Sequence, residues 1–350
     1  MMPATAMRVL HGITTDPVYL HLSHLTDDRG VFEHALGDEP RREHGYCVDD
    51  VARALIVAVR EPNQTLELGG IAGLCLRFLT SAIEPDGKSH NRLNSHGEWT
   101  DRASTDDCWG RSLWALGVAA VQAPMADTRD DALAAFVRLA SQRSVDVRAM
   151  AFASLGASEL VSSGNTDPVV RSLLVDALTI IPTSESSGWG WPEDRLRYAN
   201  GTLAEAIIAG GEATGDAGLT RRGLVILETL IRLETRDGHL SVTGTDGRGP
   251  SETGPQFDQQ PIEVAAIADA AARAYEATGS DHWLDVLRMS WHWFLGDNDS
   301  GAVMIDEVTG AGFDGLESRG RNDNRGAEST LAALRTWQNA CLYGLLEGTA

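Results

Sequence analysis

The sequence predicts an all-α protein in which six helical hairpins close into an (α/α)6 barrel. Apolar residues recur at the i, i+3, i+4 and i+7 spacing of an amphipathic helix along most of the chain. Charged helices alternate with small-residue-rich ones, so that a unit of outer helix, loop and inner helix occurs six times. An open solenoid is the competing geometry, but six units without polar capping repeats favour closure of the ring.

The expected helices follow one another with few long breaks. They are a short segment at 17–25 and then 51–59, 66–83, 113–121, 132–140, 147–161, 169–181, 203–213, 219–233, 262–278, 283–295 and 329–346. A glycine just beyond the apolar run ends several of them, at 162–165, 214–216 and 278–280. The pattern therefore predicts about twelve helices.

The inner helices are those rich in Ala and Gly, because small side chains permit the close packing of an inner ring. Their expected starts are Asp49, Asp106, Asp146, Asn200, Pro261 and Gly326. Turn-rich loops at 86–101 and 237–249 are expected to form short β-hairpins on one rim. No linker or low-complexity segment divides the chain, so we expect one domain over residues 1–350.

Composition excludes several classes of function. Twenty-nine Lys and Arg against 50 Asp and Glu give a net charge of −21, which argues against binding to nucleic acid or to anionic membranes. No apolar stretch has the length of a membrane span, and the N-terminus does not resemble a signal peptide. The four cysteines are scattered without a CxxC pair, as in a cytosolic protein, and we expect neither a metal nor a cofactor.

Five of the six inner helices begin with unusually polar and aromatic segments. These segments are "HGYCVDDVARAL", "STDDCWGRSLWAL", "YANGTLAEA", "FDQQPIEVAA" and "NDNRGAESTLAAL", whereas the third inner helix, at "SVDVRAM", begins more plainly. Helix capping accounts for one Asp or Asn at each start, but not for a doubled Asp with neighbouring Arg and aromatic residues. In a closed barrel all these segments face one cup, where carboxylates and amides would bind sugar hydroxyls and aromatic rings would cover apolar sugar faces.

The candidate residues of this cup fall into two groups. The candidate catalytic residues are Asp49, Asp50, Asp106, Asp107, Glu263 and Glu328. The candidate substrate-binding residues are His44, Tyr46, Arg53, Trp109, Arg111, Trp189, Trp191, Asn200, Glu205, Asp258, Gln259, Gln260, Asn324 and Arg325. Arg53 and Arg111 follow Asp49 and Asp107 by about one helical turn and are expected to keep those carboxylates ionised. His21 and His24 have a spacing that brings side chains together on a helix, but core packing explains them better than a metal site.

The segments "HGYCVDDVARAL", "FDQQPIE" and "NRGAESTLAAL" resemble the six-hairpin glycosidase superfamily of (α/α)6 barrels. More closely, they resemble the helical module associated with family 4 glycosyltransferases and found near family 130 mannoside phosphorylases. This resemblance implies a carbohydrate ligand and a glycosyltransferase partner, fused or encoded nearby. The segment "TDDCWGRSLWAL" is also similar to the Asp-Asp motif of family 76 α-mannanases, in which one Asp is the nucleophile and its neighbour is the acid/base. That likeness implies such roles for Asp106 and Asp107.

The sequence therefore favours a cytosolic glycoside hydrolase that acts on oligosaccharides, with mannosides as the leading substrates. Hydrolysis needs two carboxyl groups, about 5–5.5 Å apart for retention or about 6.5–9.5 Å for inversion. Asp50 and Asp107 are the first candidates, and a pair from two helices is as plausible as a pair within one motif. A sugar epimerase of the N-acylglucosamine 2-epimerase type is the first alternative, although that class relies on histidines. A non-catalytic glycan-binding barrel is the second.

Overall fold

The computed structural model describes residues 16–182 and 189–346, and the described residues form twelve α-helices. The segment on which the signal-peptide expectation rests lies almost wholly outside the described residues. The helices are α1 (Leu20–His24), α2 (Val48–Arg60), α3 (Leu66–Ser81), α4 (Asp107–Gln122), α5 (Ala126–Leu139), α6 (Val147–Ser162), α7 (Pro168–Ile180), α8 (Asn200–Thr214), α9 (Ala217–Glu234), α10 (Pro261–Thr278), α11 (Asp281–Phe294) and α12 (Ala327–Leu342). The predicted (α/α)6 barrel is confirmed.

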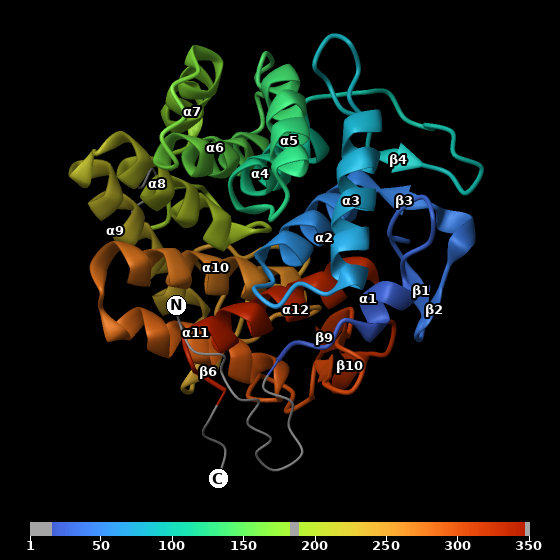
Figure 1. The fold of residues 1–350 in the computed structure, drawn as a ribbon. Coiled ribbons are helices and arrows are strands. Elements are labelled where there is room, and N and C mark those ends of the chain that lie inside the picture. The colour runs from blue at the N-terminus through green and yellow to red at the C-terminus, as the bar shows by residue number, and fades with distance from the viewer. Residues whose placement is uncertain (1–15, 183–188, 347–350) are drawn as a thin grey trace, which may run out of the picture.

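Six of these helices form a closed inner ring. Helices α2, α4, α6, α8, α10 and α12 each contact the next, and α12 returns to contact α2. Helices α3, α5, α7, α9 and α11 each pack outside the inner helix that precedes them, and the short α1 packs against α12. Figure 1 shows the pairs succeeding one another around the molecule, from the blue α2 and α3 through the green α6 and α7 to the orange α10 and α11. The open solenoid is thereby excluded.

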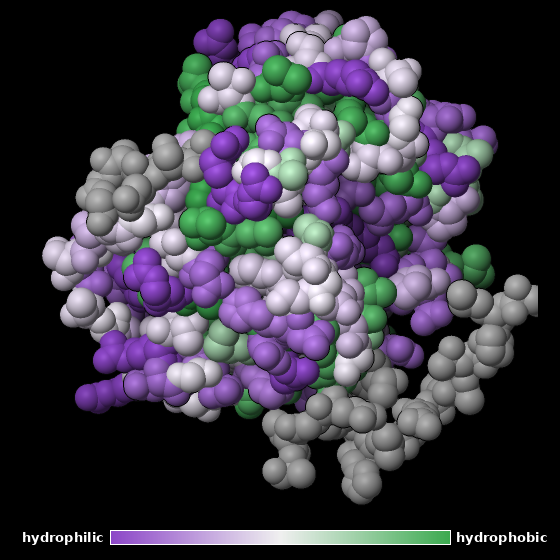
Figure 2. Space-filling view, turned by 90° about the vertical axis from the view of Figure 1, so that its left-hand side faces the viewer, coloured by the Kyte–Doolittle hydropathy of each residue, from purple (hydrophilic) through white to green (hydrophobic). Residues whose placement is uncertain are grey.

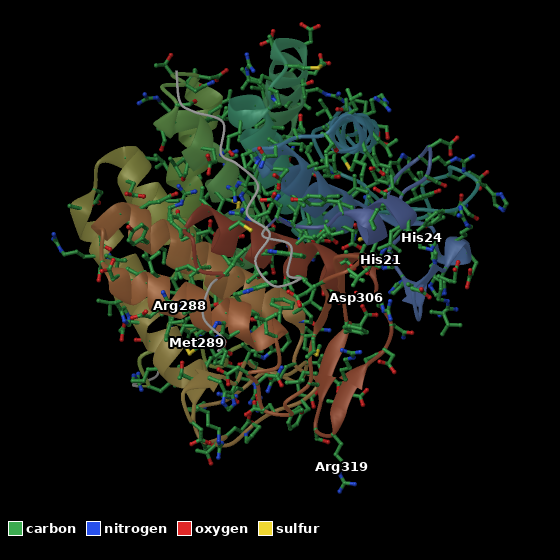
Figure 3. The ribbon with its side chains drawn as sticks, turned by 60° about the horizontal axis from the view of Figure 1, so that its bottom comes forward. His21, His24, Arg288, Met289, Asp306 and Arg319 are labelled. Atoms are coloured by element: carbon green, nitrogen blue, oxygen red, sulfur yellow. The ribbon has the colours of Figure 1, made fainter. Side chains whose placement is uncertain are left out.

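Short antiparallel strand pairs occupy the loops that lead into the inner helices. The pairs are β1 (Ala35–Leu36) with β2 (Glu39–Pro40), β3 (Tyr46–Cys47) with β4 (Arg92–Leu93), β5 (Thr235–Arg236) with β6 (His239–Leu240), β7 (Ile305–Asp306) with β8 (Ala311–Gly312), and β9 (Gly315–Glu317) with β10 (Gly320–Asn322). Figure 3 shows Arg319 projecting from the tip of the β9–β10 hairpin. Within the loop at 86–101 an antiparallel bridge joins Leu93 to Trp99, as expected for a hairpin, and its strand β4 also pairs with the distant β3.

Helix boundaries differ from the sequence expectation mainly at the polar starts. Helix α4 begins at Asp107, whereas its apolar period begins at 113. Helix α12 begins at Ala327 and ends at Leu342, against an expected 329–346. The polar first turns belong to the helices themselves and not to the preceding loops. Apolar periodicity misses such turns because their side chains face a cup and not a core.

The tightest helix contact in the ring joins α4 to α6 through glycines. A Cβ atom added to Gly117 would lie 2.4 Å from the carbonyl oxygen of Gly156, and one added to Gly110 would lie 2.2 Å from that of Ala149. Real Cβ atoms do not approach backbone oxygens so closely. The Gly-rich character of these inner helices is thus a requirement of close backbone packing and not of flexibility.

The outer surface is mixed in polarity. Figure 2, seen from the side of α8 and α9, shows hydrophilic residues spread among hydrophobic ones, in keeping with the high charge of the chain. Among the described residues, no helix is both long enough and apolar enough to span a bilayer.

We expect Gly117→Ala to lower the free energy of unfolding by about 1–3 kcal/mol, because the new methyl group forces α4 away from α6. Gly70→Ala is the matched control: it lies on the exposed face of α3, and an added Cβ there meets no atom within 4 Å. That variant should gain about 1 kcal/mol from helix propensity alone. Urea unfolding of the two variants measures both changes, and equal stabilities would contradict the close α4–α6 contact.

Candidate functional site

The first turns of the inner helices meet in one cup at the N-terminal end of the ring. Arg53 of α2 links two of its carboxylates: its Nη1 donates to Asp50 at 2.5 Å and its Nη2 to Glu328 of α12 at 2.6 Å. Asp50 is buried, whereas the side chain of Glu328 is 39% exposed. Burial raises the pKa of Asp50 to about 7, although Arg53 opposes the shift. Asp50 therefore positions Arg53, and Glu328 is the member of this trio that solvent and ligands can reach.

Asp49 lies on the other side of the same helix turn. Its Oδ2 accepts from the side-chain amide of Asn91 at 3.1 Å, and Oδ1 lies 3.6 Å from the Nε of Arg111 on α4. That distance exceeds a hydrogen bond, and the buried Oδ1 has no hydrogen-bond partner. Asp49 therefore has one carboxylate oxygen that accepts no hydrogen bond and lies beside the Arg111 guanidinium. Arg111 faces Asp49 across the helix interface and also favours the ionised form of Asp107, as expected. Arg53 pairs with Asp50 and Glu328 and not with Asp49.

Asp107, the first residue of α4, is half-buried in the cup and accepts a hydrogen bond from the hydroxyl of Tyr198. Burial raises its pKa, against the opposing effects of Arg111 and of the Tyr198 hydrogen bond, and the charge of Asp49 adds to the rise. Asp106 precedes the helix, is exposed, and makes no side-chain capping bond. The two adjacent aspartates therefore have different environments, and only Asp107 faces the cup.

The third inner helix also contributes to the cup, contrary to its plain sequence. Arg148 of α6 is 4% exposed and forms a bidentate pair with Glu193, at 2.5 and 2.7 Å. The same guanidinium donates to the carbonyl of Tyr198 at 3.0 Å and to the Oδ1 of Asn200 at 3.3 Å. Arg148 thereby fixes the loop that holds Tyr198 against Asp107. Asn200 contributes to this support and not to an open binding surface.

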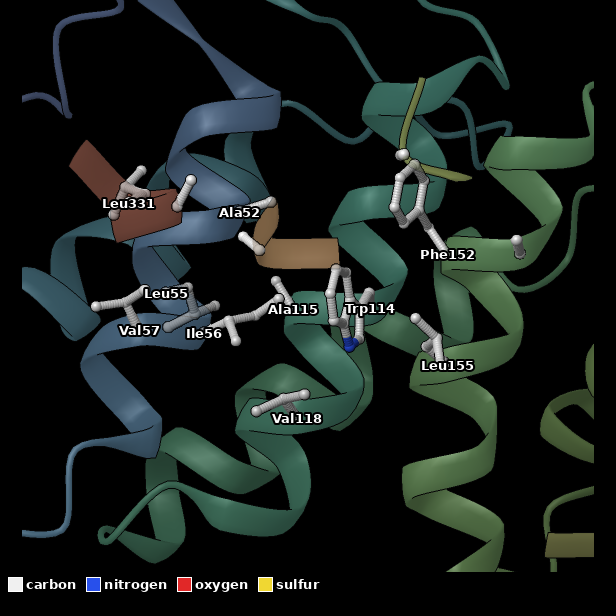
Figure 4. Close-up of a cluster of buried hydrophobic side chains, with 14 of the residues drawn as sticks. Ala52, Leu55, Ile56, Val57, Trp114, Ala115, Val118, Phe152, Leu155 and Leu331 are labelled. Carbon is white, nitrogen blue, oxygen red and sulfur yellow. The ribbon is translucent and has the colours of Figure 1, made fainter. Parts of the chain in front are cut away.

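The floor of the cup is apolar. Trp114 of α4 and Phe152 of α6 stack with ring centroids 5.8 Å apart, and Figure 4 shows both in a cluster of buried side chains that also includes Ile56 of α2. The Arg111 guanidinium lies 4.0 Å from the centre of the Phe152 ring. A narrow space of about 40 Å³ near these side chains holds roughly one water molecule. Phe152 is 1% exposed and Trp114 8% exposed, so Phe152 offers no open face to a ligand and Trp114 only an edge of its ring.

Both carboxylate oxygens of Glu263 accept hydrogen bonds from the residues at the start of α8. This buried side chain accepts from the backbone N–H groups of Ala199 and of Asn200 (3.2 Å) and from the Asn200 side-chain amide (3.0 Å). Ala199 has the left-handed conformation, with φ of 48°, which turns the chain into α8. Burial raises the pKa of Glu263 to about 8, while these donors favour its ionised form. A carboxylate that caps another helix in this way has no oxygen available for a substrate.

Several other candidate residues lie away from the cup. Trp109 and Trp191 are completely buried and offer no face to a ligand. Tyr46 is also buried, with its hydroxyl bound to Asp27 at 2.7 Å. Trp189 is partly exposed, but its indole N–H donates to the carbonyl of Glu193 at 2.9 Å and anchors its own loop. The aromatic candidates are thus mainly packing residues.

The candidates from the last two loops also have structural partners. Gln259 is buried and donates to Asp299 at 2.6 Å. Asn324 accepts from the backbone of Gly37 at 3.0 Å, and the Arg325 guanidinium lies 4.9 Å from the centre of the Phe313 ring. Asp258, Gln260 and His44 are at least partly exposed, and no side-chain hydrogen bond to another cup residue holds them there. Glu205 lies deeper along α8 and faces the opposite end of the barrel.

Sequence reasoning missed cup residues that come from loops. Asn91 and Tyr198 lie outside the inner helices, and Glu33 pairs with Arg92 on the rim. Ligand atoms of Glu33, Cys47 and Asp50 lie within 4.8 Å of one another, a spacing that suits a metal ion, but Arg92 and Arg53 already neutralise the two carboxylates. The tyrosine in "YANG" was the one available signal, because it directly precedes a predicted polar helix start.

The paired histidines His21 and His24 lie together on α1, with ring centroids 6.0 Å apart (Figure 3). His21 is buried, and its Nε2 is 2.8 Å from the carbonyl oxygen of Arg325. Burial lowers the pKa of His21. This contact ties α1 to the loop before α12, as expected for a packing residue.

We expect Glu263→Ala to lower the free energy of unfolding by about 3 kcal/mol, because it leaves three buried N–H donors without an acceptor. Glu263→Gln should recover only part of this loss, since its amide NH2 opposes the same donors. Glu67→Ala, on the exposed first turn of α3, is the control and should change stability by about 0.5 kcal/mol or less. Unchanged urea unfolding of Glu263→Ala would contradict the capping role.

Comparison with solved structures identifies the fold with that of several carbohydrate enzymes. A sugar epimerase from a ruminal bacterium has a TM-score of 0.74 at 14% identity, over 92% of this chain and 95% of that one. Cellobiose 2-epimerase from Bacillus thermoamylovorans has a TM-score of 0.73 at 12% identity, over 93% and 96%. A GH76 α-mannanase from Bacteroides thetaiotaomicron has a TM-score of 0.64 at 10% identity, over 93% of both chains.

Sequence comparison adds no closer assignment: no protein-family model matches the chain, and no curated protein sequence matches it. At identities of 14% or less, the structural similarity establishes the fold and leaves the chemistry to the residues of the cup. This chain is therefore an (α/α)6 barrel with the architecture found in sugar epimerases and in a GH76 α-mannanase.

Proposed function

We propose that the protein is a carbohydrate-active enzyme that hydrolyses glycosidic bonds of oligosaccharides, with mannosides as the first substrates to test. The observation that carries the proposal is the pair Asp107 and Asp49, two carboxylates in the first turns of neighbouring inner helices that share Arg111 as a charge partner. Structural similarity to a GH76 α-mannanase and to sugar epimerases supports a sugar ligand in this cup.

Asp107 is the proton donor in this proposal. Burial favours its protonated form, as a general acid requires, and Tyr198 fixes its orientation. The acid transfers its proton to the glycosidic oxygen, and the bond from that oxygen to the anomeric carbon breaks. The sugar leaving group departs as a neutral alcohol.

Asp49 is the second carboxylate. The adjacent Arg111 lies 3.6 Å from its Oδ1, a buried oxygen that makes no hydrogen bond. Catalysis therefore requires the cup to open at Asp49 when substrate binds, so that this oxygen can either attack the anomeric carbon or take a proton from the attacking water. In the first case water then hydrolyses the glycosyl-enzyme, and Asp107 accepts the proton of that water. Asp50, the first candidate on α2, acts instead through Arg53.

Glu328 and Arg53 are proposed to bind sugar hydroxyls. At the α12 side of the cup, the Glu328 carboxylate offers hydrogen-bond acceptors and the Arg53 guanidinium offers donors. The Glu328 side chain is the more exposed of the two. Trp114, the more exposed of the two stacked rings, would lie under the apolar face of the sugar. The inner helix starts thus supply both parts of sugar recognition.

Epimerisation of a free sugar is the second candidate, because the structures with TM-scores of 0.74 and 0.73 are those of epimerases. Among the described residues, the first turns of the inner helices carry carboxylates and arginines but no histidine. A carboxylate would then have to move the proton on the sugar carbon. A glycan-binding role beside a glycosyltransferase stays a third proposal.

We expect Asp107→Asn to lower kcat for release of reducing sugar from mannosides by at least about 100-fold, as loss of a general acid does. Asp49→Asn should have a comparable effect, because it removes the second carboxylate. Asp131→Asn, an exposed residue on the outer helix α5, is the control and should keep full activity. Full activity in Asp107→Asn, or solvent deuterium entering a free sugar without any hydrolysis, would overturn the hydrolase proposal.

The pH profile gives an independent test of Asp107. Activity should fall as pH rises through the raised pKa of this acid, because its ionised form has no proton to donate. The Tyr198 hydrogen bond favours the ionised form, so Tyr198→Phe should raise the pKa further and move the alkaline limb of the profile to higher pH. An alkaline limb that moves to lower pH in Tyr198→Phe would contradict the assignment.

A further inference from the structure

A second polar cavity lies at the opposite end of the barrel, where the inner helices end. It has a volume of about 970 Å³, and every inner helix contributes to its lining through Arg60, Gln122, Glu159, Glu205, Arg273 and Gln338. The narrow space beside Trp114 and Phe152 borders this cavity at Asp269 and Arg335 and borders the cup at Arg53 and Arg111.

The three arginines of this cavity already have carboxylate partners. Arg60 and Arg273 both pair with Glu159, at 3.3 and 2.8 Å, and Arg335 pairs with Asp269 at 2.8 Å. Gln122 also donates to Glu159 at 3.0 Å, and Asn339 to Asp269 at 2.8 Å. These cations are therefore not available as the main binding groups for an anionic ligand.

Two buried acceptors in the same cavity have no partner. Glu205 is 2% exposed, and its Oε2 makes no hydrogen bond. Gln338 is 6% exposed, and its Oε1 makes none, although its amide NH2 donates to Tyr19 and to the carbonyl of Val57. Buried acceptors without donors are costly, and a ligand that supplies N–H groups would satisfy both.

The charges at this end favour a cation. Even without Glu205, the lining residues Asp16, Glu61, Glu159, Asp269 and Glu276 outnumber the three arginines. The inner helices also direct the negative ends of their dipoles toward the cavity. Glu205 faces Asp269 and Arg273 of α10, Arg60 of α2 and Arg335 of α12, and burial raises its pKa to about 8. A cation placed beside this carboxyl would favour its ionised form.

We propose that this cavity is a second ligand site, distinct from the cup, which binds a small molecule through a primary ammonium group placed against Glu205 and Gln338. An amino sugar and a linear polyamine share this chemistry, and the volume accommodates either. The ammonium supplies three N–H donors, which can bind the two acceptors that have no hydrogen-bond partner. Its positive charge offsets the surplus of carboxylates. The proposal stands without the hydrolase assignment, since it uses no residue of the cup.

The test is calorimetric titration of the full-length protein with glucosamine, with glucose, and with spermidine. We expect glucosamine to bind at least tenfold more tightly than glucose, in which a hydroxyl replaces the amine. If spermidine binds and glucosamine does not, the site is assigned to polyamines. Because burial raises the pKa of Glu205 and a bound cation would lower it again, amine binding should release a fraction of a proton, seen as a heat that depends on the buffer. Glu205→Gln should remove this proton release and weaken amine binding at least tenfold.

Asp107→Asn is the matched control, since it alters the cup alone and should bind the amine like the unmodified protein. Circular dichroism establishes that Glu205→Gln is folded, and proton release in the unmodified protein tests the proposal without any variant. Any one of four results would overturn the proposal. Two concern affinity: equal affinity for glucose and glucosamine, or no binding of either amine. The other two are amine binding without proton release and amine binding that Glu205→Gln leaves unchanged. Amine binding that Asp107→Asn abolishes would overturn it as well, because that result would place the amine in the cup.

Discussion

Closure of the inner ring with all six helices in one direction is the constraint on which the rest of the structure depends. Contacts at both ends demonstrate this common direction: Arg53 meets Glu328 at the helix starts, and Arg60 meets Glu159 at the helix ends. Closure requires close approach of neighbouring backbones, which the glycines of α4 and α6 permit. Six polar helix starts, far apart in the sequence, are thereby brought to one place.

A ring of parallel helices also has an electrical polarity. Helix N-termini carry partial positive charge, which stabilises carboxylates such as Asp49 and Asp107 in the first turns. The negative helix ends are balanced by Arg60, Arg273 and Arg335, and carboxylates in turn bind these cations. The same architecture thus builds one polar region at each end of the ring.

The sequence predicted the order of the helices and their closure into a ring. It could do so because the apolar period and the small-residue content of each helix reflect how that helix packs. It was less informative about side-chain roles at the helix starts. Asp107 faces the cup as expected, but Glu263 caps α8, and Trp109 and Trp191 are core residues. These outcomes depend on which loop packs over each side chain, as when Arg148 anchors the loop that carries Tyr198. Periodicity within one helix contains no information about such contacts between distant segments.

The most direct test of the central claim is a crystal structure of the Asp107→Asn variant with a bound mannoside oligosaccharide. We expect a sugar ring over Trp114, with the glycosidic oxygen within hydrogen-bond distance of the substituted side chain at the start of α4 and with hydroxyls bound to Glu328 and Arg53. An oligosaccharide bound only in the cavity at the helix C-termini, or only on the outer helices, would contradict the claim.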